Sequence, residues 1–137
     1  MKKIFIIGLL SFLLVACGDK EKVDTGNDSV TLTHKFAEFN LDVDYSTTKK
    51  YEASFEKEVD GIEARIEDDV NNKNLSGNKA YDVLNPILEK LTFDPTTPND
   101  QVINEVLSAF SLDNNFIEFE LDVLFSDGTQ KEYRLIK

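Results

Sequence analysis

Hydrophobic and polar residues alternate in several segments of this chain, which is the pattern of β-strands that bury one face. In the first segment, Phe39, Leu41 and Val43 share one face, and acidic or amide side chains occupy the other. Polar residues and Asp-Gly pairs separate neighbouring segments, as tight turns require. The pattern predicts a three-strand meander and a C-terminal hairpin. The alternating segments are residues 39–45, 51–55, 62–66, 117–125 and 133–135.

Between the third and fourth segments the hydrophobic spacing lengthens to three and four residues, which is typical of amphipathic helices. The first helix is expected over about residues 80–91 and contains Pro86. Proline removes a backbone donor, so the helix either kinks there or restarts with Asn85 as its cap. We favour one kinked helix. The second helix is expected to begin with Thr97 as the capping hydroxyl and Pro98 as the first helical residue.

The order of these elements is three strands, two helices and two strands. We therefore predict an α+β fold in which an antiparallel sheet is packed on one face by two helices. The expected domain spans residues 36–137, a length that supports one hydrophobic core but not two. The order of the strands within the sheet stays open.

The chain begins Met1-Lys2-Lys3 and continues with a hydrophobic run, the pattern of a secretory signal that is too short to span a bilayer. The run ends in Leu14-Val15-Ala16-Cys17, which looks like the lipobox of bacterial lipoproteins. We expect residues 1–16 to be a signal peptide that is cleaved before Cys17. Cys17 would then carry a diacylglyceryl group, and two or more acyl chains are enough to hold the protein stably at the outer face of the cell membrane.

Residues 17–35 are polar and small without a hydrophobic period, the composition of a flexible tether. His34, the only histidine, is expected to be solvent-exposed at its end. Cleavage would remove two of the 15 basic residues, leaving 13 against 26 acidic ones, and move the formal net charge from −11 to −13. Such a surface repels nucleic acid and anionic lipids. We therefore expect no nucleic-acid partner, membrane contact through the lipid on Cys17, and a monomer.

The expected domain lacks the side chains of common catalytic sites. The only cysteine would carry the lipid and the only histidine lies in the tether, so a Ser-His-Asp triad, a Cys-His pair or a tetrahedral zinc site cannot be assembled. We therefore expect no catalytic residues and no enzymatic activity. A hydrolase built on two carboxylates is a remote alternative, because we expect no acid to have an apolar setting that would raise its pKa.

Calcium is the one cofactor that the residues leave open, because carboxylate and amide oxygens are its ligands. The best local cluster contains Asp68, Asp69 and Asn71. Tested as an EF-hand loop, it fails, since Lys73 takes a ligand position and Ala80 replaces the closing glutamate. One hypothesis is that these three residues form a looser metal site. The other is that they only end a strand and begin a loop.

Glu118, Glu120 and Asp122 recur with a period of two and so share one face of the penultimate strand. A solvated exterior is the default interpretation of such a face. The functional alternatives are an acidic interaction face for a basic partner, or an edge strand that pairs with an extended peptide.

Two long segments carry motifs in a characteristic order. They read IEARIEDDVNNKNLSGNKAYDVLNPILEKLTFDPTTPNDQVINEVLSAF and FIEFELDVLFSDGTQKEY. The landmarks are the Ile-Glu-Asp-Asp end of the third strand, the Asn-Pro-Ile-Leu motif of the first helix and the acid-rich strand before the last Asp-Gly. Over residues 39–133 the chain resembles the YusW-like family of small bacterial extracytoplasmic proteins, many of them lipoproteins. The resemblance implies the fold and the location, and it implies no activity or catalytic residue.

These observations together predict a lipid-anchored extracytoplasmic protein that is a non-enzymatic binding module. Its partner would be an envelope protein, a peptide or a polymer. A calcium-binding module is the alternative, and a carboxylate-dependent hydrolase is the remote one.

Overall fold

The computed structural model describes residues 34–137 as a six-stranded antiparallel sheet with two helices. The expected signal peptide, Cys17 and most of the expected tether therefore lie outside the described residues. No helix in the described part of the chain is long and apolar enough to cross a membrane. The elements are β1 (Phe36–Ser46), β2 (Lys49–Glu58), β3 (Gly61–Asp68), β4 (Lys73–Ser76), α1 (Gly77–Lys90), α2 (Asn99–Ala109), β5 (Glu118–Phe125) and β6 (Gln130–Ile136).

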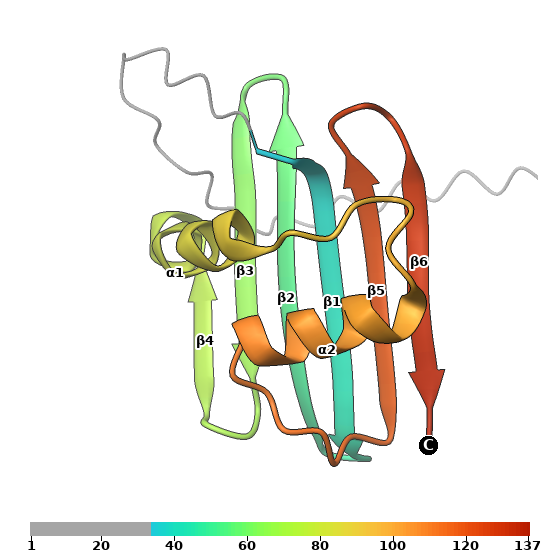
Figure 1. Ribbon diagram of the computed structural model, residues 1–137. Coiled ribbons are helices and arrows are strands. Elements are labelled where there is room, and N and C mark those ends of the chain that lie inside the picture. The colour runs from blue at the N-terminus through green and yellow to red at the C-terminus, as the bar shows by residue number, and fades with distance from the viewer. Residues whose placement is uncertain (1–33) are drawn as a thin grey trace, which may run out of the picture.

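The strands lie in the order β4-β3-β2-β1-β5-β6, so β1 is central and pairs with both β2 and β5 (Figure 1). The prediction of an α+β fold with an antiparallel sheet is confirmed at the level of class. The predicted element order is only partly matched, because the short strand β4 was not expected. Its sequence, Lys-Asn-Leu-Ser, holds one hydrophobic residue, and it is recognised by its pairing with β3 rather than by a pattern.

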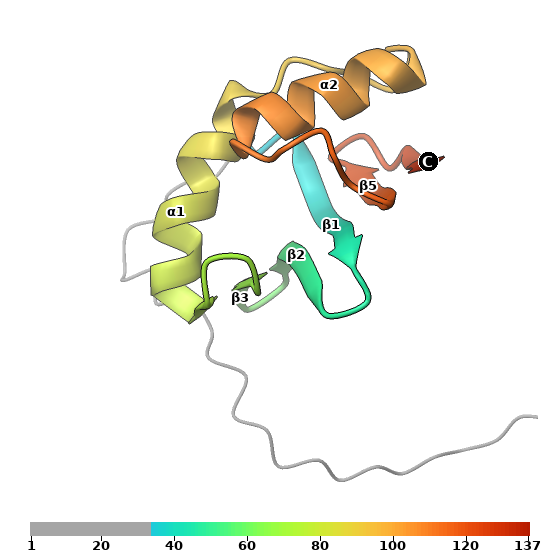
Figure 2. The ribbon, with the colours of Figure 1, turned by 90° about the horizontal axis from the view of Figure 1, so that it is seen from below.

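Both helices lie on the same side of the sheet, and no helix of residues 34–137 lies on the opposite side (Figures 1 and 2). α1 lies closest to β3 and β4, and α2 crosses the sheet toward β6. α1 runs through Pro86 without a break, so Asn85 is inside the helix and not its cap. α2 begins one residue later than predicted, because the Thr97 hydroxyl accepts a hydrogen bond from the Asp94 amide instead of capping the helix.

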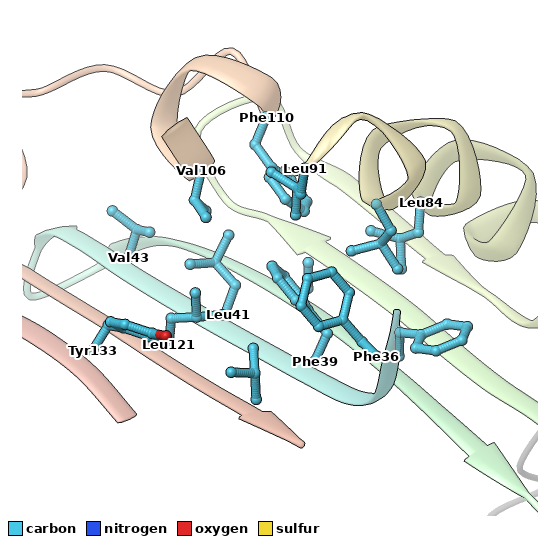
Figure 3. Packing of buried hydrophobic residues seen from close by; sticks show 14 of the residues in the cluster. Phe36, Phe39, Leu41, Val43, Leu84, Leu91, Val106, Phe110, Leu121 and Tyr133 are labelled. Carbon is cyan, nitrogen blue, oxygen red and sulfur yellow. The ribbon is translucent and has the colours of Figure 1, made fainter. Parts of the chain in front are cut away.

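The core fills the space between the sheet and the helices. Figure 3 shows Leu84 of α1, Val106 of α2 and Phe110, directly after α2, pointing toward the side chains of β1. Phe39 of β1 stacks on Phe110 with ring centroids 5.7 Å apart. Each such side chain, when fully buried, contributes about 1.5–3 kcal/mol. Most of the predicted inward residues are buried. Tyr45, Tyr81 and Ile87 are only partly buried, and Ile117, just before β5, and Leu135, near the end of β6, are 49% and 41% exposed.

The chain enters β1 through His34 and Lys35, which are held against the domain. His34 is only 9% exposed, its ring packs edge-on against Phe55 at 4.9 Å, and its Nε2 lies 3.3 Å from the Tyr81 hydroxyl. The Lys35 ammonium donates to the Thr92 carbonyl at 2.8 Å. The prediction of a solvent-exposed His34 is therefore wrong, because the aromatic residues that cover it are far away in the sequence.

Candidate functional site

The side of the sheet that faces away from the helices is lined with polar side chains and is hollowed at its centre. The hollow has a volume of ≈ 330 Å³ and is formed by β1, β2, β3 and β5. We call this surface the acidic face. It is lined by Asn40, Leu41, Asp42, Glu52, Ala53, Ser54, Arg65, Glu67, Glu120 and Asp122.

Four carboxylates of the acidic face lie in one row that crosses four strands. On β1, Asp42 is directly opposite Glu52 of β2 on one side and Glu120 of β5 on the other. Glu52 is in turn opposite Glu67 of β3. Like charges at directly opposed positions of a sheet are destabilising. Packing of the core does not require an acid at these outward positions, so the row marks a surface of functional interest.

Three of the four acids in this row have a basic partner within the chain. Glu52 accepts from the Lys50 ammonium at 2.6 Å. Glu67 pairs with Arg65 at 2.9 Å. Glu120 lies 3.7 Å from the Arg134 guanidinium.

Asp42, at the centre of the row, differs from these three acids. Within residues 34–137 it forms no ion pair, and its Oδ1 is shielded from solvent without a hydrogen-bond partner. Asp42 Oδ1 can therefore still accept a hydrogen bond or pair with a positive charge.

Burial raises the pKa of Asp42 from 3.8 to about 6, and the negative charges of Asp44, Glu52 and Glu120 add to the effect, while Lys50 opposes it. The hydrogen bond from Lys50 has the opposite effect on Glu52 and lowers its pKa. The expectation that no acid of the domain has a raised pKa is therefore wrong. It failed because the neighbours of Asp42 come from three strands whose pairing cannot be read from the sequence.

The predicted interaction residues Glu118, Glu120 and Asp122 all lie on the outer side of β5, and the last two line the hollow. Glu118 accepts a hydrogen bond from Arg134 Nε at 2.8 Å. Because β5 pairs with both β1 and β6, it is not an edge strand. The alternative in which this strand pairs along a free edge with an extended peptide is therefore excluded.

The predicted metal residues lie at the end of β3, away from the hollow. Asp68 is 8% exposed, and its two carboxylate oxygens accept hydrogen bonds from the amide and the side chain of Asn71, at 3.0 and 2.7 Å. The Asp69 side chain is exposed, while its amide donates to the Lys50 carbonyl. This arrangement is that of an aspartate that closes a turn after a strand, since both Asp68 oxygens already have donors.

A second group of acids lies on the β2–β3 hairpin. Carboxylate oxygens of Glu56, Glu58 and Glu63 lie within 4.8 Å of one another. These side chains are exposed or half-exposed, and exposed acidic groups are common on proteins without any ion. The hairpin group therefore does not add to the candidate site.

Comparisons with known proteins give a family but no activity. Residues 37–127 match the family model described as YusW-like protein. The chain is 28% identical over 120 residues to a Bacillus subtilis (strain 168) protein named "Uncharacterized protein YusW", covering 85% of this chain and 83% of that protein. No solved structure matches this chain significantly.

Proposed function

This chain belongs to the YusW-like family, and on that premise we propose that it is a lipid-anchored, non-enzymatic binding module of the bacterial envelope. We take the acidic face as its binding surface and a positively charged partner as its ligand. The observation that carries this proposal is the row of four carboxylates on a hollowed sheet face that no helix of residues 34–137 covers, in which Asp42 Oδ1 has no hydrogen-bond partner.

The negative charge of the acidic face favours a positively charged partner. A surface of one sign attracts the opposite charge and repels its own sign. A basic segment of an envelope protein or peptide fits this requirement, whereas nucleic acid does not. The domain is proposed to act as a monomer.

The proposed anchor is the lipid on Cys17, which lies outside the described residues. Its support is the position of Cys17 at the end of the hydrophobic run Ile4–Ala16, after Leu14-Val15-Ala16. An anchor at that point would keep the acidic face at the outer side of the membrane, within reach of other envelope components.

The test is crosslinking and co-purification of the full-length protein from its native membranes, with two double variants. Asp42→Asn with Glu120→Gln removes two charges from the acidic face. Asp82→Asn with Asp100→Asn removes two charges from exposed positions on the helices. We expect a stoichiometric partner that is lost only with the first variant. Retention of that partner by the first variant, or its loss with both variants, would contradict the proposal.

One observation favours a second candidate function, a carboxylate-dependent hydrolase. The pKa of Asp42, raised to about 6, is near the value suited to a general acid or base at neutral pH. The candidate predicts turnover of a wall-sugar or peptide substrate that Asp42→Asn abolishes. Absence of turnover by the wild-type protein across such a panel would remove this candidate.

A further inference from the structure

Two residues at the start of the domain, His34 and Lys35, are held by hydrogen bonds from distant parts of the chain. We call them the entry segment. The Ser126 hydroxyl, in the β5–β6 turn, donates to the His34 carbonyl, and the Ser126 amide donates to the Lys35 carbonyl at 2.9 Å. The Lys35 ammonium lies 5.7 Å from the centre of the Phe93 ring and donates to the Thr92 carbonyl. The entry segment is therefore fixed to residues that follow it by 57 and 92 positions.

The ring of His34 is buried between β2 and α1. It packs edge-on against the fully buried Phe55 of β2, and its Nε2 lies 3.3 Å from the Tyr81 hydroxyl of α1. A neutral imidazole can accept a hydrogen bond from that hydroxyl, whereas an imidazolium has donors only. A charged ring at this position would also lose most of its hydration. The site therefore suits the neutral form of His34.

The charged groups around His34 do not compensate for its burial. Glu89 on α1 favours the imidazolium, and Lys57 on β2 opposes it. Tyr81, which also faces the ring, stays neutral because burial raises its pKa above the usual 10. Loss of solvent is the largest effect on His34, so its pKa lies below the ordinary value of 6.5.

Going beyond the proposed function, we infer that His34 is a pH-sensitive latch: its neutral ring holds the entry segment against α1 and β2, and protonation of the ring releases that segment. A protonated ring regains its hydration only by leaving the contact with Phe55. The carbonyls of His34 and Lys35 then separate from Ser126. In the proposed anchored protein the entry segment joins the domain to its tether, so acidification would loosen the domain on its anchor.

The size of the pH effect follows from the ordinary pKa of an exposed imidazole, which is 6.5. At pH 5.5 the released ring is protonated in a ratio of about ten to one, and at pH 7.5 in a ratio of about one to ten. A proton that binds only the released state raises the equilibrium constant for release about tenfold between these pH values. Glu89 lets the docked ring bind some protons too, so about tenfold is the largest change expected.

Hydrogen exchange of two amides in the β5–β6 turn can measure this release. The Ser126 amide is protected by the Lys35 carbonyl, whereas the Gly128 amide donates to the Phe125 carbonyl at 2.9 Å and makes no contact with the entry segment. The measurement is NMR hydrogen exchange on the full-length protein in neutral detergent at pH 7.5 and pH 5.5. Each rate is corrected for the intrinsic pH dependence of amide exchange, which gives a protection factor.

Two variants distinguish a latch from simple packing. His34→Gln keeps a polar side chain that can hydrogen-bond to Tyr81 but cannot be protonated at these pH values. Glu89→Gln removes the negative charge that favours the imidazolium, at an exposed position of α1. Thermal unfolding checks that both variants are folded.

We expect the protection of the Ser126 amide to fall several-fold from pH 7.5 to pH 5.5, while the Gly128 amide keeps its protection. His34→Gln should abolish this difference, and Glu89→Gln should enlarge it. Protection of Ser126 that does not change with pH, or that falls equally in His34→Gln or equally at Gly128, would overturn the latch. If His34→Gln does not fold, a fall in Glu89→Gln no larger than in the wild type would overturn it. None of these outcomes involves the acidic face, so the proposed function stands or fails separately, by the crosslinking test.

Discussion

Replacing Asp42 with asparagine should make the domain more stable at neutral pH, although it removes a charge from the candidate site. Asparagine has almost the same shape and carries no charge, so the substitution removes the cost of an ionised carboxylate that has no partner. The core on the other side of β1 is untouched, because Asp42 faces away from the helices.

The magnitude follows from the raised pKa. The pKa of Asp42 rises from 3.8 to about 6 on folding, and each unit corresponds to about 1.36 kcal/mol. The largest gain in the free energy of unfolding that Asp42→Asn could give is therefore about 3 kcal/mol. Asp42 is only half-buried, so solvent screening reduces the expected gain to about 1–2 kcal/mol. For a domain of this size, that corresponds to a rise in Tm of roughly 5–10 °C.

The change in stability that Asp42→Asn causes depends on pH. Because the folded state holds the Asp42 proton more tightly than the unfolded state, the wild-type protein loses stability as pH rises from about 4 to about 6. Asp42→Asn should therefore match the wild type near pH 4 and exceed it in Tm at pH 7.5. The assay is thermal unfolding by circular dichroism at both pH values, with Asp122→Asn as the control for loss of one charge. A lower Tm at pH 7.5, or an equal gain at both pH values, would refute the reasoning.

Three further predictions test the remainder of the account. Phe39→Ala should destabilise the domain by about 3–5 kcal/mol, because it opens a cavity among stacked core rings; a loss below 1 kcal/mol in denaturant unfolding would contradict that packing. Burial lowers the pKa of His34 below 6.5, so the domain should lose stability as pH falls below 6.5, and an imidazole NMR titration with a midpoint above 6.5 would argue against a buried His34. Cys17→Ala should remove the lipid, and mass spectrometry that finds the same acylated mass would rule out the proposed anchor.

The sequence pattern was sufficient for the parts of the fold that depend on local periodicity. Alternation identified the inward residues of β1, such as Leu41 and Val43, and the Asp-Gly pair at the β5–β6 turn, where Gly128 has a φ of +89° that glycine adopts without penalty. Spacing of three and four residues identified both helices. β4 was missed, because four residues with one half-buried side chain produce no period.

The candidate site depends on contacts between strands that are far apart in the sequence. Alternation placed Glu120 and Asp122 on an outward face, and it assigned Asp42 to the same kind of position. Nothing in the pattern distinguished Asp42 from other outward acids, because its special property comes from pairing with β2 and β5 at once. The register across those strands places the acids in one row and leaves Asp42 without an ion pair among residues 34–137.

The central claim is that the acidic face around Asp42 binds a cationic partner. The most direct measurement is amide chemical-shift mapping of the labelled full-length protein in detergent during titration at pH 7 with a short peptide in which lysines alternate with serines. The account predicts shifts confined to β1, β2 and β5 around Asp42, Glu52 and Glu120, and no shifts in α1 or α2. Shifts concentrated on the helices, or none at saturating peptide, would contradict it.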